Sequence, residues 1–271
     1  MNNCTCYREP PHSEVDGIPV FSQFDDYVDN YERISRDHLD HLEKTGHNPF
    51  MHEDHWQEIE TSTLSLVRKY VASRARILDV GVGMGRLLEQ ALEFERFGMD
   101  IAMGYLQCAK KKGINVCMSK IEDMPYLDEF FDAIVITDVL EHVLDVNLAL
   151  KKILDVLKPN GFLIIRVPYQ EDLNPYLNPS YPYDLVHLRT FDSPSLRLLL
   201  EKVFRLKTHE IVLTGYVGGQ LKYWIPPLPK LRGLVRWLVD FTKVFGVSFF
   251  ERLSRRINKP TEINVVVQKA G

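Results

Sequence analysis

The sequence predicts an α/β protein built on a doubly wound, mostly parallel sheet with helices on both faces. Three observations support this fold class. Apolar strand-like segments alternate with amphipathic helical segments along most of the chain. A glycine-rich turn at 79–85, "DVGVGMG", follows the first of these strands and precedes a helix. Two further strand-like segments, 206–213 and 262–269, close the chain.

The elements can be placed in order from their apolar periodicity. Two helices are expected ahead of the alternating region, at 25–45 and 51–73. The strands that follow are rich in apolar and β-branched residues and are expected at 76–80, 96–100, 114–118, 131–137 and 162–167. The helices between and after them are expected at 85–94, 102–112, 145–157 and 193–202. The alternation therefore predicts crossover connections and parallel strands.

Composition indicates an ordinary globular protein. The chain has 271 residues, of which 45% are hydrophobic and 26% charged, which is ample for a full core. Its four cysteines are too few for a disulfide framework and indicate a reducing compartment. The first 20 residues lack the apolar core of a signal peptide, and no apolar run is long enough to span a membrane. A cytoplasmic protein is expected.

Charge is concentrated between the last two strands. Residues 216–260 hold nine Lys and Arg against Asp240 and Glu251, a net +7 in a chain whose total is −4. Apolar side chains recur there at helical spacing, which predicts a helical insertion. Three interpretations stay open for 216–260: a cap over the active site, a homodimer contact, or peripheral contact with an anionic membrane at the inner face. Nucleic acid is not expected as a partner, because the patch is apolar and the rest of the chain is acidic.

The glycine turn predicts a nucleotide cradle of a particular kind. The nicotinamide fingerprint G-x-G-x-x-G does not fit, because Gly81, Gly83 and Gly85 alternate and Arg86 stands where the third glycine would fall. The turn also lacks the lysine of a phosphate-binding loop. Asp100 ends the next strand, where a carboxylate can accept both hydroxyls of a ribose. A nucleoside without phosphates fits this pattern, and S-adenosylmethionine is such a ligand.

Five motifs in order give the chain a family resemblance. It resembles the class I S-adenosylmethionine-dependent methyltransferases through "ILDVGVGMGRL" (77–87), "GMDIA" (98–102), "EDMPY" (122–126), "FDAIVITDVLEHV" (131–143) and "LKPNGFLIIRVPY" (157–169). The resemblance implies a Rossmann-like, seven-stranded, mostly parallel sheet whose last strand is antiparallel. Two domains are expected: an N-terminal extension and cofactor-side helix at 1–50, and the methyltransferase domain at 51–271 with its insertion at 214–261.

The resemblance also implies which residues hold the cofactor, S-adenosylmethionine, and its product, S-adenosylhomocysteine. The glycines would pack against the methionine part, Asp79 would hold its amino group, and Asp100 the ribose. Ile101 would lie on the adenine, and Glu122 and Asp123 near its edge, although Lys120 replaces an acidic residue often found there. The residues expected around the sulfonium are Thr137, Asp138 and Val139.

Two histidines are candidates for acceptor chemistry. His187 lies in "YDLVHLRTF", beyond the fifth strand of the alternating region, and is expected to be the general base, with Asp184 as its orienter. His142 in "LEHV" is open between packing and a substrate-side role. The expected activity is methyl transfer to a hydroxyl or amine of a small-molecule, glycan or lipid-linked acceptor. The alternative is a catalytically silent relative that binds a membrane or protein partner through 216–260.

No metal site is expected from the sequence. Cys4 and Cys6 are too few for structural zinc. The amino-terminal histidines, some of them three residues apart, are expected on solvated helix faces; they are His38, His41, His52 and His55.

Overall fold

The computed structural model describes residues 6–217, 219, 237 and 247–271. Over these residues the chain folds around one sheet, whose seven principal strands follow the order β5-β4-β3-β6-β7-β9-β8. These strands are β3 (Arg76–Val80), β4 (Glu95–Asp100), β5 (Asn115–Met118), β6 (Phe131–Thr137), β7 (Leu157–Pro168), β8 (Lys207–Thr214) and β9 (Glu262–Gln268).

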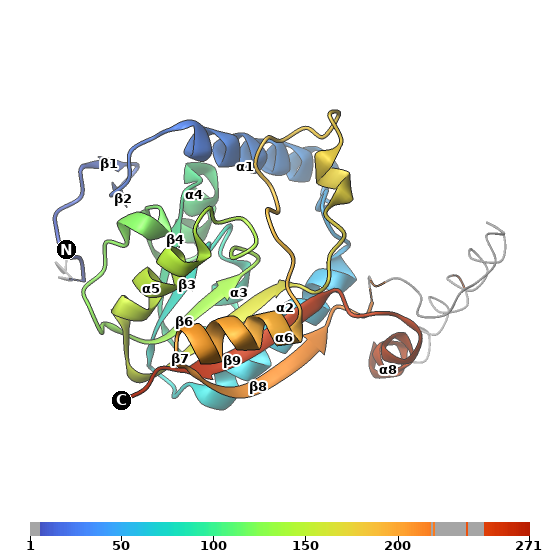
Figure 1. The fold of residues 1–271 in the computed structure, drawn as a ribbon. Helices are drawn as coiled ribbons and strands as arrows, with labels where there is room; N and C mark the ends of the chain where they lie inside the picture. The colour runs from blue at the N-terminus through green and yellow to red at the C-terminus, as the bar shows by residue number, and fades with distance from the viewer. Residues whose placement is uncertain (1–5, 218, 220–236, 238–246) are drawn as a thin grey trace.

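Strand directions confirm the predicted Rossmann-like α/β fold. Strands β3 to β7 are mutually parallel, and β9 runs antiparallel to both β7 and β8. Helices α5 (Val146–Val156) and α6 (Ser193–Arg197) pack on one face of the sheet, whereas α2 (Glu53–Tyr70) and α4 (Met103–Lys111) pack on the other (Figure 1). The sheet is therefore doubly wound, as the strand–helix alternation predicted.

The core has two halves, one on each face of the sheet. Adjacent residues of a strand point to opposite faces, so Leu78 belongs to one apolar cluster and Ile77 to the other. Both side chains are fully buried. Burial on both faces explains why these strands read as continuous apolar runs rather than as alternating ones.

The sheet has two strands more than predicted, because an amino-terminal hairpin extends it beyond β5. Strands β1 (Ser13–Val15) and β2 (Ile18–Val20) pair antiparallel, and β2 joins β5 in parallel at Val20 and Met118. Asp16 and Gly17 both have positive φ, 51° and 69°, as a two-residue hairpin turn requires. The Asp-Gly pair was the sequence signal for this hairpin, but three-residue strands are too short to show a period.

Two predicted elements differ in length. The helix expected at 85–94 is only one turn, α3 (Arg86–Glu89), because the amides of Gln90 and Ala91 bond to carbonyls three residues back. This tighter turn brings the chain round to β4. Helix α6 continues as a π-helical turn at 198–203, which completes the helix expected at 193–202.

Helix α1 (Asp26–Thr45) crosses the carboxyl end of the sheet above α4 (Figure 1). Its ends are capped by the Asp25 side chain and by Gly46, whose φ is +70°. In the insertion, α8 (Val247–Ile257) confirms a helix, while 218, 220–236 and 238–246 lie outside the described residues. The contacts expected of 216–260 therefore stay predictions. No helix in the described ranges is long and apolar enough to cross a membrane.

Candidate functional site

A cavity of about 1390 Å³ opens at the carboxyl ends of the central strands, beneath α1 and the start of α2. This is the position where open α/β sheets bind ligands. Its volume exceeds the roughly 300–1,000 Å³ of most single-ligand pockets, so a cofactor and a second molecule can share it. Of the predicted site residues, those that line the cavity are Asp79, Gly81, Gly83, Asp100, Ile101, Glu122, Thr137, Asp138, Val139, His142 and His187.

The three glycines of the turn have different tasks. All have positive φ, and a Cβ added at Gly81 would lie 2.2 Å from Cγ2 of Val139, so this glycine lets β3 and β6 approach. A Cβ at Gly85 would lie 2.6 Å from Cδ1 of Ile114, which makes Gly85 a packing glycine outside the cavity. A Cβ at Gly83 would meet nothing within 4 Å. Gly83 is thus the glycine where a ligand can approach the backbone.

Asp100 is fixed by backbone amides at the end of β4. Its Oδ2 accepts from the Gly83 amide at 2.9 Å and its Oδ1 from the Ala102 amide at 2.9 Å. A carboxylate has about four acceptor positions, so Asp100 keeps capacity for a ligand hydroxyl beside the backbone amides that it already accepts from. Burial raises the pKa of Asp100, and the backbone hydrogen bonds oppose that rise. Asp100 therefore has the capacity that a ribose site needs.

Asp79 is the buried carboxyl group behind the glycine turn. Its side chain is 2% exposed, and its Oδ1 accepts no hydrogen bond from the described part of the chain. Burial raises the pKa of Asp79 well above its ordinary value, and Arg166 opposes the rise. A buried acceptor without a partner is costly unless a ligand satisfies it. An ammonium group on a bound molecule would do so.

The predicted adenine-edge pair separates in the structure. Glu122 lines the main cavity, but Asp123 points to the hydroxyl of Ser22 at 2.6 Å and lines a second cavity on the other side of the segment. Asp123 therefore does not face the cavity in which the adenine was expected, and the prediction for it is wrong. The reason is the amino-terminal strand: Ser22 follows β2, whose pairing with β5 the sequence did not reveal.

Asp138 follows β6 in a left-handed conformation with φ +56°, which is uncommon for a non-glycine residue. The guanidinium of Arg166 holds it through both Nε and Nη2. Arg166 is 2% exposed and also donates to Thr63 Oγ1 at 3.3 Å. Strain of this kind persists only where surrounding contacts fix it. Sequence reasoning missed Arg166, although an arginine within the apolar strand "FLIIRV" was a signal.

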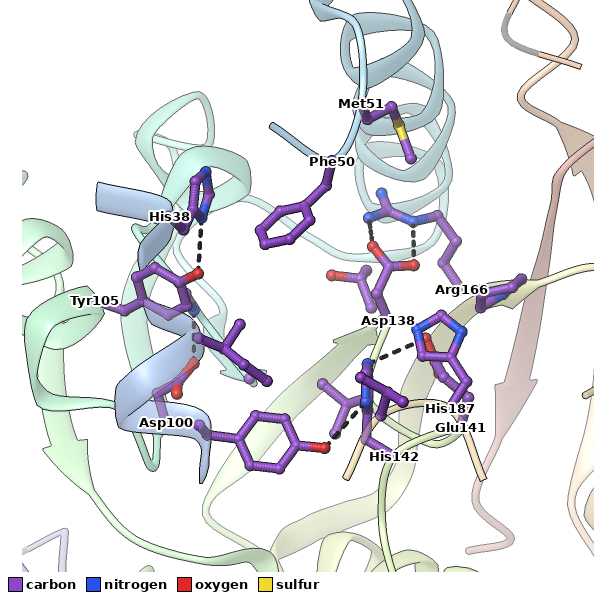
Figure 2. A pocket seen from close by; sticks show the side chains of 18 of the residues that line it. His38, Phe50, Met51, Asp100, Tyr105, Asp138, Glu141, His142, Arg166 and His187 are labelled. Carbon is purple, nitrogen blue, oxygen red and sulfur yellow. Dashed lines mark hydrogen bonds and ion pairs between the residues drawn. The ribbon is translucent and has the colours of Figure 1, made fainter. Parts of the chain in front are cut away.

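His142 and His187 lie together across the cavity from Asp100 (Figure 2). Their ring centroids are 4.5 Å apart. Nδ1 of His142 lies 3.1 Å from the hydroxyl of Tyr31 on α1. Burial, with His187 second, lowers the pKa of His142 to about 3, so its imidazole is neutral near pH 7. The structure therefore gives His142 a place at the cavity as well as in the packing.

The predicted orienter of His187 is wrong. Asp184 has a side chain 85% exposed, and it pairs with Arg33 at 3.0 Å. Glu171 takes its place: Oε2 lies 2.5 Å from Nδ1 of His187, and Oε1 accepts from the Tyr176 hydroxyl at 2.7 Å. Burial raises the pKa of Glu171, but these hydrogen bonds outweigh it and leave the pKa below normal. Sequence spacing could not find Glu171, because a folded loop separates it from His187.

Two amino-terminal histidines also depart from expectation. His38 and His55 are 6% and 5% exposed and line the cavity, where solvated faces were expected. His38 Nδ1 lies 2.7 Å from the Tyr105 hydroxyl, and His55 Nε2 lies 2.9 Å from Thr261 Oγ1. Burial lowers the pKa of each to about 4. The polar composition of α1 concealed the burial of His38, because α1 faces a cavity rather than a core.

The cavity as a whole carries excess acid. Its lining includes nine Asp and Glu side chains against four Lys and Arg. Burial raises the pKa values of Asp79, Glu141 and Glu262 well above normal, which favours their neutral forms until a bound cation stabilises the carboxylates. A cleft with one dominant sign of charge favours ligands of the opposite sign. The arrangement thus suits a cationic molecule.

Comparison with known proteins agrees with this geometry. Residues 78–165 match the family model described as a methyltransferase domain. An uncharacterized protein of Methanocaldococcus jannaschii is 34% identical over 110 residues, which cover 40% of this chain and 52% of that protein. A ubiquinone biosynthesis O-methyltransferase of Azorhizobium caulinodans is 33% identical over 98 residues, covering 33% of this chain and 39% of that protein. The chain thus spans about half or less of these relatives.

The fold has relatives among solved structures. An S-adenosylmethionine-dependent methyltransferase of Thermotoga maritima has a TM-score of 0.55 at 18% identity, over 89% of this chain and 99% of the other. The glycine turn and Asp100 both lie within the region that the family model matches. Residues 78–165 therefore form a methyltransferase domain, in a chain that has the fold of S-adenosylmethionine-dependent methyltransferases.

Proposed function

We propose that the protein transfers a methyl group from S-adenosylmethionine to a hydroxyl oxygen of a small-molecule acceptor. One observation carries this proposal: Asp100 and the His142–His187 pair lie on opposite sides of the same cavity (Figure 2). A ribose-binding carboxylate and a pair of proton-accepting groups are what a cofactor and a hydroxyl acceptor would each need.

The cofactor side of the cavity is formed by β3, β4 and β6. Gly83 leaves room for the methionine part, and Asp79 offers its unpartnered Oδ1 to the ammonium group. Asp100 would accept hydrogen bonds from the ribose, and Ile101 and Glu122, which line the same cavity, would face the adenine. Thr137, Asp138 and Val139 line the cavity at the end of β6 and would surround the sulfonium. When bound, S-adenosylmethionine supplies a methyl group already activated by its positive sulfur.

The acceptor side of the cavity is formed by His142, His187 and their partners. His187 takes the proton of the acceptor hydroxyl on Nε2, because its Nδ1 is engaged by Glu171. The Glu171 carboxylate fixes the tautomer of His187 and stabilises its charged form. His142, neutral and 4.5 Å from His187 between ring centroids, lines the place of the acceptor. Positioning of this kind can supply about 7–11 kcal/mol of the barrier.

An oxygen acceptor is favoured over an amine by two considerations. A hydroxyl needs a base, and the His187–Glu171 pair provides one. The Azorhizobium relative is by name an O-methyltransferase. The cavity is large enough for a small acceptor beside the cofactor. Glycan and lipid-linked acceptors would depend on 216–260, so they stay predictions from the sequence.

The domain organisation of the chain can be described from the same cavity. We propose that 1–50 act as an extension whose helix α1 closes the cavity, because Tyr31 and His38 line it from above. Residues 51–271 would form the methyltransferase domain, with the insertion at 214–261. Asn30 of α1 donates to the carbonyl of Leu185 at 2.8 Å, which connects the extension to the His187 loop.

The proposal is tested by turnover. The full-length protein is incubated with methyl-labelled S-adenosylmethionine and a small-molecule extract, and labelled products are identified by mass spectrometry. An O-methyl product formed together with S-adenosylhomocysteine supports the proposal. A labelled N-methyl product overturns the hydroxyl acceptor. Binding of S-adenosylhomocysteine without any product supports the catalytically silent alternative.

A further inference from the structure

Three potential metal ligands converge on the acceptor side of the cavity. Glu141, His142 and His187 each offer a ligand atom, and these atoms all lie within 4.8 Å of one another. They come from two segments, the turn after β6 and the loop that precedes α6. The Glu141 carbonyl accepts from the Leu188 amide at 2.8 Å, which holds the two segments in register. Figure 2 shows the three side chains grouped beside Asp138.

The Glu141 carboxyl group points to a ligand independently. Its residue is fully buried, and neither oxygen accepts a hydrogen bond from any other described residue. The nearest basic nitrogen recorded is Nε2 of His142, 3.9 Å from Oε1. A buried carboxyl group with both oxygens unpartnered is rare, because such groups are paired, hydrogen-bonded or bound to metal. Glu141 therefore has two acceptor atoms and no assigned partner among the described residues.

The two histidines are held as metal-binding histidines are. A ligating imidazole uses one ring nitrogen for the ion and donates from the other to an outer partner. His187 has its Nδ1 2.5 Å from Oε2 of Glu171, and His142 has its Nδ1 3.1 Å from the hydroxyl of Tyr31. Nδ1 is thus engaged in both rings, and Nε2 is the nitrogen that each would offer to an ion, although the His142 ring also has a backbone hydrogen bond with Val186. Tyr176 further supports Glu171 at 2.7 Å.

We propose that Glu141, His142 and His187 bind a divalent metal cation, an inference that rests on the proposed function and deepens it. Two imidazole nitrogens and one carboxylate favour Mn²⁺, Fe²⁺ or Zn²⁺ over Mg²⁺ or Ca²⁺. With bonds of about 2.0–2.2 Å, neighbouring ligands of one tetrahedral or octahedral ion lie roughly 3–3.6 Å apart. The three ligand atoms lie within 4.8 Å of one another, so side-chain movements of about 1 Å would bring them onto one ion.

The site would select acceptors by their oxygens. Three protein ligands leave coordination positions open on the cavity side, where the acceptor lies. An acceptor with two adjacent oxygens, such as a vicinal diol or a catechol, would bind through both of them. The metal would lower the pKa of the bound hydroxyl, whose proton passes to solvent. With a metal bound, His187 would act as a ligand, so the base role proposed for it above would apply only to the metal-free protein, while methyl transfer to an oxygen is kept. The site also revises the sequence expectation of no metal.

The binding experiment uses full-length protein stripped with a chelator. Mn²⁺ is titrated in the presence of S-adenosylhomocysteine and followed by electron paramagnetic resonance, with Zn²⁺ competition as a second probe. One Mn²⁺ per chain is expected in the wild-type protein. Glu141→Gln and His187→Ala should weaken binding by more than about 100-fold, and Glu171→Gln by about 10–100-fold. His41→Ala and Glu43→Gln, exposed on α1, are the matched controls and should bind Mn²⁺ normally.

The outcomes separate the two proposals. Calorimetry with S-adenosylhomocysteine is run on every variant to show that it is folded. If Glu141→Gln is misfolded, the metal affinity of His187→Ala tests the site instead. Cofactor binding without stoichiometric Mn²⁺ or Zn²⁺ overturns the metal site and leaves the proposed function. Mn²⁺ affinity that is equal in the wild type, Glu141→Gln and His187→Ala overturns it as well. Metal binding without cofactor binding overturns the proposed function and leaves the metal site.

Discussion

The amide of Gly83 donates a 2.9 Å hydrogen bond to Oδ2 of Asp100, which joins the glycine turn to the end of the neighbouring strand. This bond fixes the carboxylate before any ligand arrives, so binding loses little side-chain entropy. It also means that substitution of Asp100 affects both a ligand acceptor and the support of the turn.

Asp100→Ala is expected to weaken binding of S-adenosylhomocysteine by at least about 100-fold. Two hydrogen bonds to a charged acceptor are lost, each worth about 1.5–3 kcal/mol. Isothermal titration calorimetry measures the effect. Asp123→Ala is the matched control, because that carboxylate faces Ser22 outside the main cavity. Equal affinity in folded Asp100→Ala and wild type would remove Asp100 from the cofactor site.

Gly83→Val and Gly85→Val are expected to fail in different ways. At Gly83 a side chain enters the space left for the cofactor, so cofactor affinity is lost while the protein stays folded. At Gly85 the side chain would collide with Ile114, so the melting temperature should fall. A valine with positive φ destabilises the folded state by about 1–2 kcal/mol at either position. Any further difference in melting temperature between the two variants therefore reports the collision at Gly85. Calorimetry and thermal denaturation separate the two, and a reversed pattern contradicts the assignment.

His187→Ala is expected to reduce turnover by about 10²–10⁴-fold with cofactor affinity near normal. His142→Ala tests the other ring of the pair. The companion variants are Glu171→Gln, which should lower the turnover number, and Asp184→Asn, which should leave it unchanged because Asp184 is exposed. Activity is measured as S-adenosylhomocysteine released with an identified acceptor. If Asp184→Asn slowed the reaction and Glu171→Gln did not, the orienter predicted from sequence would be restored.

The sequence predicted the parts of the site that local chemistry determines. A glycine turn and a carboxylate one strand later are separated by a fixed number of residues, so Gly83 and Asp100 could be found by reading along the chain. Glu171 and Arg166 could not, because their partners His187 and Asp138 meet them only in the folded sheet. Secondary-structure propensity and hydrophobic periodicity describe residues that are close in sequence. The Glu171–His187 and Arg166–Asp138 pairs depend instead on loop conformation and strand order.

Stability should fall as the pH is lowered from about 7 to 4, in part through His38 and His55. Burial lowers the pKa of each to about 4, with Arg86 and His41 acting on His38, and Arg166 on His55. Between about pH 6.5 and 4 the unfolded chain binds more protons at these groups, so their contribution to stability decreases as pH falls.

Thermal denaturation at pH 7 and pH 4.5 measures this effect. The double variant His38→Gln, His55→Gln should lose less melting temperature between the two pH values than the wild type, even if it is less stable at pH 7. Carboxyl groups titrate in both proteins, so the comparison isolates the histidines. An equal loss in the two proteins would show that these histidines do not couple protonation to folding.

The basic insertion gives the last prediction, which comes from the charge of 216–260. Arg252, Arg255 and Arg256 are exposed on α8, and basic residues near anionic headgroups contribute about 1 kcal/mol each. We expect the protein to sediment with anionic vesicles at low salt and less so at high salt, because salt screens the attraction. Replacing these three arginines with glutamate should release the protein while cofactor affinity stays normal. Neutral vesicles are the control for apolar adsorption. If the protein sediments at no salt concentration and instead forms a stable dimer that Trp237→Glu disrupts, the insertion is an oligomer contact and the membrane interpretation is wrong.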